Sequence, residues 1–325
     1  MKSEEIVLLN SVSAPSVHPD GHRAVVSVTR PDFAADAYVG QLWEIPLNDD
    51  GDTPRRLTRG FRDTAPQYAP DGGTVAFLRA APGEAPQLFA VESRGAEPVQ
   101  LTDRRLGVSG FAWSPDSASL VFAAPVPEEG RYGTVEGLDP GAEDARLITG
   151  YKFRMNGAGY TNDKRAQLFR LDAPDLQAEP PIRPTGRAKK QAEDEGRKFQ
   201  PVPEPLQLTH GAADHQSPRF SADGSRIYFS AGLHAEADSD LIADIYSVDT
   251  SGQGLRKHTN LQDQPGERIA ASLPAPSADG RWLFFLGSEL GQSGTDFVAR
   301  NTGLYVVPTD SSAPARRLTD AVTID

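Results

Sequence analysis

Three small groups of residues carry side chains that could do chemistry. Asp214, His215 and Ser217 are the residue types of a hydrolytic triad. His18 and His22 lie four residues apart and could share a metal ion. The run 236–240 (EADSD) offers carboxylates of the kind that bind calcium. The chain has no cysteine, so thiolate nucleophiles, cysteine-ligated zinc and disulfides are excluded.

Each of these groups is better explained by structure than by catalysis. Ser217 and His18 occupy fixed positions of a repeat that is described below. His22 flanks the same turn as His18, and we interpret it as a turn residue and not as a metal ligand. The run 236–240 lacks the spacing and the glycine of a known calcium loop, which indicates a solvated loop. We therefore predict no catalytic residue, no metal site and no cofactor in this chain.

Composition narrows the class of protein further. The 325 residues carry a formal net charge of −12, which argues against a nucleic-acid partner because phosphate backbones attract basic surfaces. No window approaches the roughly 18 apolar residues that a membrane helix needs. The opening MKSEEIVLLN lacks the long apolar core of a signal peptide. These features predict a cytoplasmic protein with no membrane and no nucleic-acid partner.

A repeat with an aspartate turn recurs along the chain. Its unit has a small residue and proline, then an aromatic or apolar residue, then Ser/His/Ala-Pro/Ala-Asp-Gly and a short apolar strand. The turn aspartates are Asp20, Asp71, Asp116, Asp223 and Asp279. Proline presets φ, aspartate bonds back to its own turn and glycine accepts a positive φ, so each unit predicts a tight hairpin turn. The predicted strands after the turns are 23–28, 74–79, 119–123, 226–230 and 282–287.

Two further segments follow each turn in a fixed order. The first alternates like a half-buried strand and covers 41–45, 87–91, 167–171, 244–248 and 303–307. The second is a short outer strand that ends in threonine, at 56–58, 100–102, 207–209, 257–259 and 317–319. Four strands per period of about 40–50 residues are typical of a propeller blade. The fold class is therefore all-β, a β-propeller with about five recognisable four-stranded blades.

The spacing from Asp116 to Asp223 is twice that of the other periods, yet it contains one set of the later strands. We interpret it as one expanded third blade with insertions at 125–163 and 173–205. The second insertion is rich in proline and then in charge, which predicts a flexible surface loop. One propeller domain then covers 1–325, with 1–13 as a lead-in.

The blades resemble the propellers of the prolyl oligopeptidase family of serine peptidases and of TolB-like proteins. The segment Tyr151–Leu171, which begins YKFRMNGAGYTNDKRAQLF, resembles the third-blade segment of the acylaminoacyl-peptidase and dipeptidyl-aminopeptidase branch. In that family an α/β-hydrolase domain follows the propeller and carries the serine in a Gly-x-Ser-x-Gly elbow. The near misses at 107–110 and 291–294 have the wrong spacing. The catalytic domain is therefore expected to be missing from this chain or encoded downstream, and this polypeptide alone to be inactive.

The resemblance also implies a function. The parent enzyme would hydrolyse short peptides, and the propeller would gate their access to the catalytic domain. Propeller insertions in dipeptidyl-peptidase relatives reach toward the substrate, which makes Tyr151, Arg154 and Tyr160 the candidate substrate contacts. An arginine can pair with a carboxylate and an aromatic ring can pack on a side chain. The competing interpretation of this segment is structural packing against the hydrolase domain.

Two other functions stay open at this point. A stand-alone TolB-like propeller would bind proteins as a scaffold. A propeller enzyme with a metal in its channel, such as a lactonase, would need clustered acidic residues or histidines at strand ends, and no such set is visible. Five blades are fewer than the seven or eight that are common in the family. We therefore expect an incomplete propeller that comes from a fragment or a truncated reading frame. Such a propeller should be marginally stable alone, because open strand edges and apolar faces stay exposed.

Overall fold

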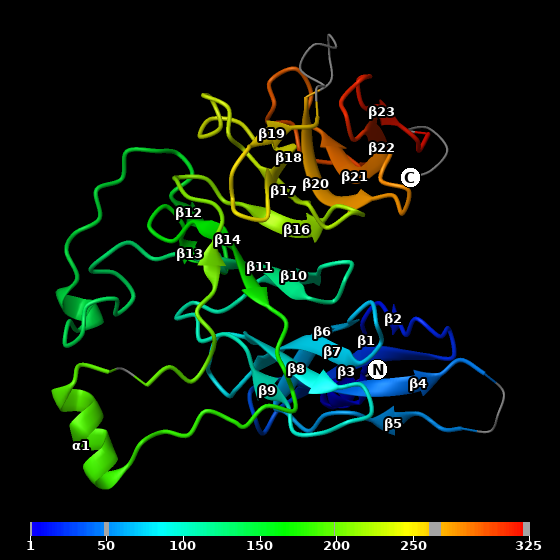
Figure 1. Cartoon of the computed structure of the whole chain (residues 1–325). Helices are drawn as coiled ribbons and strands as arrows, with labels where there is room; N and C mark the ends of the chain where they lie inside the picture. Colours follow the sequence, from blue (N-terminus) through cyan, green and yellow to red (C-terminus); the bar gives the residue numbers. More distant parts are fainter. Residues whose placement is uncertain (1, 49–51, 198, 260–267, 321–325) are drawn as a thin grey trace. The chain divides into compact units, whose positions relative to one another are not determined.

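The computed structural model describes residues 2–48, 52–197, 199–259 and 268–320. Strands dominate, and the described residues contain one α-helix, α1 (Gly186–Asp194). The chain divides into two compact units, Met1–Gly107 with Leu171–Pro205, and Val108–Arg170 with Leu206–Asp325. The described strands pair into antiparallel blades, and a parallel pairing of Gly40 with Arg62 joins the first two blades in one nine-stranded sheet (Figure 1). This arrangement confirms the predicted propeller blades. No described helix is long and apolar enough to cross a membrane.

The first unit contains blades 1 and 2. In blade 1, β1 (Ser11–Val12) and β2 (Ser16–Val17) both pair with β3 (Arg23–Asp32), which pairs with β4 (Ala37–Pro46) and then β5 (Arg55–Arg56). β1 and a 3-10 helix, Ser3–Leu8, lie inside the segment 1–13 that was predicted as a lead-in. Blade 2 has the order β6 (Arg62–Tyr68), β7 (Thr74–Ala80), β8 (Gln87–Glu92) and β9 (Val99–Gln100).

The second unit contains blades 3, 4 and 5, each with four strands in chain order. Blade 3 has β10 (Gly110–Trp113), β11 (Ser119–Pro125), β14 (Ala166–Asp172) and β15 (Leu206–Gln207). Blade 4 has β16 (Gln216–Phe220), β17 (Arg226–Ala231), β18 (Asp244–Asp249) and β19 (Arg256–Lys257). Blade 5 has β20 (Ile269–Pro276), β21 (Trp282–Glu289), β22 (Thr302–Pro308) and β23 (Arg316–Arg317).

The aspartate turns have one geometry in all five blades. Each turn aspartate accepts a hydrogen bond from the backbone N–H two residues later, at 2.8–3.1 Å. In blades 3 to 5 a serine hydroxyl also donates to that carboxylate at 2.6 Å. This serine bond, followed by the backbone bond, lowers the pKa of Asp279 to about 2. Four turns place glycine at φ 70–76°, whereas blade 3 places Ser117 there at φ 61°.

The threonine that ends each repeat has a structural role. Its hydroxyl oxygen accepts from the backbone N–H of the second residue of the third-strand motif, at 2.9–3.1 Å in every blade. The threonines are Thr58, Thr102, Thr209, Thr259 and Thr319. Because this N–H lies just beyond the two-residue outer strand, the hydroxyl supplies the acceptor that the backbone ladder does not. The repeat therefore encodes a hydrogen bond as well as a pattern of hydrophobicity.

Strained residues mark β-bulges in three innermost strands. Ala65, Ser217 and Leu273 have φ of 50–55°, and the register shifts at the same positions in β6, β16 and β20. Each precedes a proline, a position that already restricts the backbone. The bulge explains the small-residue–proline signature of the repeat, because it bends the strand. In the fifth blade the bulge lies at Leu273-Pro274, two residues before the Ala275-Pro276 pair that opened the predicted unit.

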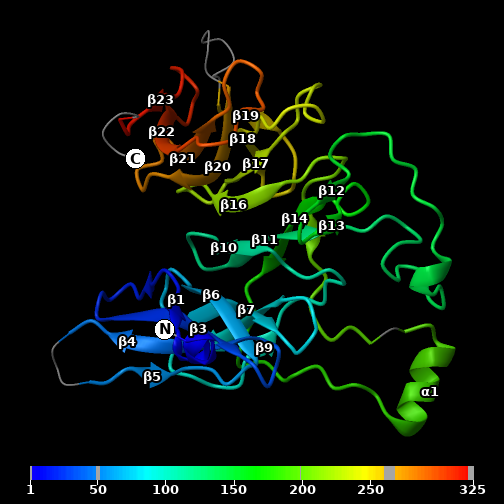
Figure 2. The ribbon, with the colours of Figure 1, turned by 180° about the vertical axis from the view of Figure 1, so that it is seen from behind.

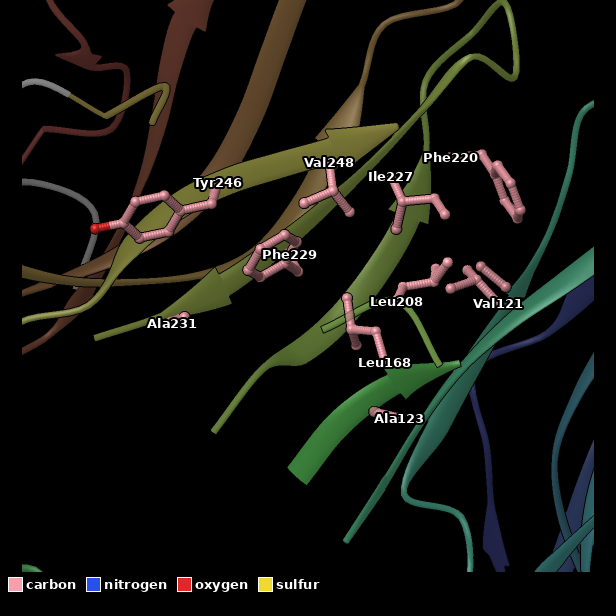
Figure 3. Packing of buried hydrophobic residues seen from close by; sticks show 11 residues of the cluster. Val121, Ala123, Leu168, Leu208, Phe220, Ile227, Phe229, Ala231, Tyr246 and Val248 are labelled. Atoms are coloured by element: carbon pink, nitrogen blue, oxygen red, sulfur yellow. The ribbon is translucent and has the colours of Figure 1, made fainter. Parts of the chain in front are cut away.

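The apolar cores lie between neighbouring blades of the second unit. Figure 3 shows the cluster shared by blades 3 and 4, in which Val121 and Leu168 meet Ile227 and Phe229. Tyr228 belongs to a second cluster, with Leu283 and other residues of blade 5. β17 is therefore buried on both faces, as the continuous apolar runs of the second strands predict. In the first unit, one cluster joins Val25 and Leu42 of blade 1 to Phe77 of blade 2.

Two long connections interrupt blade 3. One runs from the end of β11 at Pro125 to the start of β14 at Ala166, and contains a hairpin of β12 (Arg154–Met155) and β13 (Gly159–Tyr160). The other runs from Asp172 to Leu206 and, in its described part, contains α1, where an unstructured loop was expected. No residue of α1 is buried, and both views show it apart from the strands of its unit (Figures 1 and 2).

Candidate functional site

The β12–β13 hairpin carries two of the three predicted contact residues. Arg154 pairs with Tyr160 and Met155 pairs with Gly159 across the two strands. Gly157 and Gly159 have φ of 78° and 70°, which only glycine adopts readily, so the turn needs them. A further bond from the Thr161 N–H to the Phe153 carbonyl, at 2.9 Å, extends the ladder. The hairpin therefore presents the side chains of 154 and 160 together.

Tyr160 lies beside two guanidinium groups. The Arg146 guanidinium is 4.5 Å from the centroid of its ring, and that of Arg154 is 5.8 Å away. The Phe153 ring packs against it at 6.5 Å between centroids. Both cation distances lie within the range of cation–π attraction. The structure thus brings Arg154 and Tyr160 together, as a contact site would require.

Tyr151 lies just outside the hairpin and is held by its backbone. Its side chain is 81% exposed, while its N–H donates to the Asp238 carboxylate at 2.8 Å. The Lys152 N–H donates to the other oxygen of Asp238 at 3.0 Å. These two bonds, Lys152 first, lower the pKa of Asp238. A Cβ at Gly150 would lie 2.9 Å from an Asp238 oxygen, so glycine leaves room for the carboxylate.

A buried ionic cluster fixes the base of the insertion. Asp163 is 2% exposed and accepts from the Arg146 guanidinium at 2.6 Å and from the Tyr132 hydroxyl at 2.8 Å. Arg146 and Arg131 also lie within ion-pairing distance of Glu143, at 3.4 and 3.7 Å. Burial would raise the pKa of Asp163, but the bonds from Arg146 and Tyr132 outweigh it and the pKa is lowered. The carboxylate is therefore a structural anion.

Tyr132 carries strain that this cluster offsets. Its φ is 50°, an outlier for a bulky residue. Its N–H donates to Glu143 at 2.8 Å, so the residue is held at both its backbone and its hydroxyl. Burial, followed by Asp163, raises the pKa of Tyr132. Sequence reasoning missed this cluster, although Asp163 lies within the segment that carried the family resemblance.

The possible triad residues have separate structural roles. Asp214 pairs with Arg165 at 3.0 Å and accepts from the Ala166 N–H at 2.7 Å, which joins the insertion to the blade. His215 is buried with its ring 5.2 Å from that of Phe229, and burial lowers its pKa. Ser217 is the strained bulge residue of β16. In the described structure no hydrogen bond joins two of these three residues, so they form no hydrogen-bonded triad.

The other two candidate groups are also engaged structurally. His18 occupies the serine slot of its turn, with Nδ1 accepting from the Asp20 N–H at 3.1 Å and its ring against Tyr68. In the acidic run, Asp238 holds the insertion and Asp240 pairs with His234 at 2.9 Å. Among the described residues, no group of three or more histidine, aspartate or glutamate side chains could hold a metal ion.

Two cavities of the second unit lie at the aspartate turns. One of about 290 Å³ lies between the turns of blades 3 and 4, beside Asp116 and Asp223. The other, of about 590 Å³, lies between blades 4 and 5, beside Tyr228 and Asp279. The hairpin residues line neither. Because the turn carboxylates already accept hydrogen bonds from their own turns, we interpret both as grooves between blades.

Comparison with known proteins indicates what the chain is similar to, although no family model matches it. The chain is 29% identical over 245 residues to the uncharacterized peptidase YuxL of Bacillus subtilis, covering 75% of the chain and 33% of YuxL. The acylaminoacyl peptidase of Pyrococcus horikoshii superposes on 98% of the chain and 41% of its own length, with a TM-score of 0.63 and 13% identity. The chain resembles the propeller region of prolyl oligopeptidase-family peptidases.

This propeller region also resembles TolB in fold. The putative TolB of Agrobacterium tumefaciens covers 96% of the chain and 81% of its own length, with a TM-score of 0.57 and 16% identity. The propeller region spans about a third of the length of YuxL. Both structural likenesses concern the fold, and the predicted resemblance to the peptidase family and to TolB-like propellers is confirmed.

Proposed function

We propose that this propeller region belongs to a serine peptidase that cleaves short peptides and that it gates their access to an α/β-hydrolase domain. The 29% identity with a peptidase over three quarters of the chain carries this proposal. The catalytic domain would follow in the same polypeptide or be encoded downstream. We also place the parent enzyme in the cytoplasm, which cell fractionation with an antibody to this chain would test.

In this proposal the β12–β13 hairpin contacts the substrate. Arg154 and Tyr160 face one another across the hairpin, and Tyr151 is exposed beside it. The insertion is held at three points: by the Asp163 cluster, by Asp238 and by the Arg165–Asp214 pair. A contact that is fixed before binding loses less entropy when the peptide docks. This anchoring supports a recognition role for the hairpin.

The test begins with the DNA downstream of codon 325. A Gly-x-Ser-x-Gly-encoding stretch would identify the catalytic domain, and the complete protein would then be labelled with a fluorophosphonate probe and assayed on aminoacyl and N-acylated peptide p-nitroanilides. We expect labelling and hydrolysis, both lost on replacing the elbow serine with alanine. Absence of labelling with no elbow in the same or the next gene would refute the peptidase assignment.

A TolB-like scaffold is the second candidate. The match to the Agrobacterium protein covers 81% of that chain, against 41% for the acylaminoacyl peptidase. In that case the propeller would bind proteins without a catalytic domain. The same labelling experiment separates the two candidates, because a scaffold has no reactive serine.

A further inference from the structure

The arginines and lysines of the blade 3 insertion differ in whether a carboxylate neutralises them. Arg131, Arg146 and Arg165 each lie within ion-pairing distance of an acidic side chain. For Arg154, no acidic side chain of the described residues lies within that distance, and its guanidinium is exposed beside Tyr160. Lys152 is likewise free of a direct ion pair among the described residues, with Asp238 as the nearby anion.

This segment is richer in basic side chains than the acidic chain as a whole. Residues 145–165 contain five basic side chains and one acidic side chain, although the whole chain has a net charge of −12. Lys152 and Arg154, two of the cations without an ion pair, alternate with exposed apolar side chains: Tyr151 is 81% and Met155 65% exposed. We define the hairpin patch as Tyr151, Lys152, Arg154, Met155 and Tyr160.

We propose that the hairpin patch selects peptides that carry a carboxylate next to an apolar residue. The proposal rests on the proposed function and names its substrate class. Arg154 would pair with the carboxylate through two parallel N–H···O bonds, and Lys152 would add a second positive charge. Tyr151 and Met155 would cover the neighbouring apolar side chain. The carboxylate comes either from an acidic side chain or from the peptide's C-terminus.

Charge complementarity favours this ligand over a neutral or basic one. The chain as a whole is acidic, so the cations of the patch offer an acidic peptide a local attraction that the net charge of the chain does not. The patch is also preorganised, because Asp238 fixes the backbone of 151 and 152 and the ladder fixes 154 and 160. A nucleic acid would meet the same cations, but the acidic remainder of the chain disfavours so large a polyanion.

The experiment measures binding of four fluorescent hexapeptides to the full chain by fluorescence anisotropy. All share a central leucine. The residue beside this leucine and the C-terminus differ among the peptides. Three peptides have an amidated C-terminus, with glutamate, glutamine or lysine beside the leucine. The fourth peptide has glutamine beside the leucine and a free C-terminal carboxylate. We expect the glutamate peptide or the free-acid peptide to bind more tightly than the neutral one, and the stronger of the two identifies the source of the carboxylate.

The variants assign the preference to the patch. Arg154→Gln should weaken the carboxylate peptide roughly fivefold, as expected for an exposed ion pair, and leave the neutral peptide unchanged. Raising the salt concentration should likewise reduce the preference for the carboxylate peptide over the neutral one. Lys190→Gln on α1 removes an exposed cation of the other unit and should change neither peptide. Circular dichroism of each variant checks that the blades remain folded.

The outcomes separate this inference from the proposed function. Equal binding of acidic and neutral peptides, both weakened by Tyr151→Ala, would overturn the carboxylate preference and leave peptide contact at the hairpin intact. Peptide binding that none of the patch variants alters would overturn both the preference and the contact. Fluorophosphonate labelling of the complete protein reports on the peptidase assignment independently of either result.

Discussion

His258 should make this propeller region sensitive to acid. The residue stands where the other four repeats have leucine, at 57, 101, 208 and 318. It is 3% exposed, and its Nε2 lies 2.7 Å from the Ser247 hydroxyl oxygen. Burial, followed by the charge of Arg226, lowers the pKa of His258 to about 4. Below pH 6.5 the unfolded chain therefore binds a proton that the folded chain rejects.

The size of the effect follows from this difference in pKa. Because the folded pKa is depressed, the stabilisation is fully present above about pH 6.5 and is lost as the pH falls toward 4. With an unfolded pKa of about 6.5, the loss between pH 7 and pH 5 is about 2 kcal/mol. In His258→Leu this loss should vanish. At pH 7 the variant should lie within about 1 kcal/mol of the wild type, because it exchanges one hydrogen bond for apolar burial.

The assay is urea unfolding at pH 7 and pH 5, followed by tryptophan fluorescence. Trp113 and Trp282 report on the unit that contains His258. Buried His215 also has a lowered pKa, but it is present in both proteins and cancels in the comparison. Replacing the exposed His210 with glutamine is the matched control and should retain the wild-type loss. Equal loss of stability on acidification in the wild type and in His258→Leu would refute the reasoning.

Three further predictions concern the turns and the insertion. Ser117→Gly should stabilise the protein by about 0.5–1 kcal/mol because φ is 61° at this position. Gly224→Ser, at the equivalent turn position of blade 4, should destabilise it by a similar amount. Unchanged or reversed denaturation midpoints would contradict this prediction. Asp163→Ala should weaken protection of the amides of 127–165 by about 2–3 kcal/mol in hydrogen exchange and spare the blades, since it removes the carboxylate that accepts from both Arg146 and Tyr132; a uniform loss across the unit would show that the cluster is not local. Asp238→Asn should speed proteolysis after Tyr151, whereas an unchanged cleavage rate would show that its two backbone bonds do not hold the segment.

Local chemistry made the blades predictable from the sequence. An aspartate turn is specified within five residues, and each strand beside it shows its own apolar pattern, so no long-range information is needed. The predicted strands match β7 and β8 to within a residue, whereas β3 continues to Asp32, beyond its apolar run. There the pairing with β4 persists although no residue of 29–32 is buried, so the apolar pattern of the sequence gives no sign of it.

Long-range charge pairing was not predictable. Asp163 meets Arg146 and Tyr132, which lie 17 and 31 residues earlier, and Asp238 binds a backbone 86 residues away. Nothing in the spacing of these residues distinguishes a structural carboxylate from a solvated one. The hairpin itself left a local signal, the Asn-Gly at 156–157 between two short extended segments. The contact roles of Tyr151, Arg154 and Tyr160 stay predictions, although two of the side chains lie together.

The two-sided burial of β17 has a consequence for cooperativity. Phe229 contributes to the interface with blade 3, and its neighbour Tyr228 to the interface with blade 5. Both described apolar clusters that contain residues of blade 4 are shared with a neighbouring blade, so much of its folding free energy resides in these boundaries, as in a one-dimensional array of coupled repeats. Alanine at Phe229 should therefore weaken the interface of blade 4 with blade 3, and alanine at Tyr228 should weaken its interface with blade 5. Such a chain would transmit a local opening from blade to blade in sequence order, and its weakest boundary would set where unfolding begins.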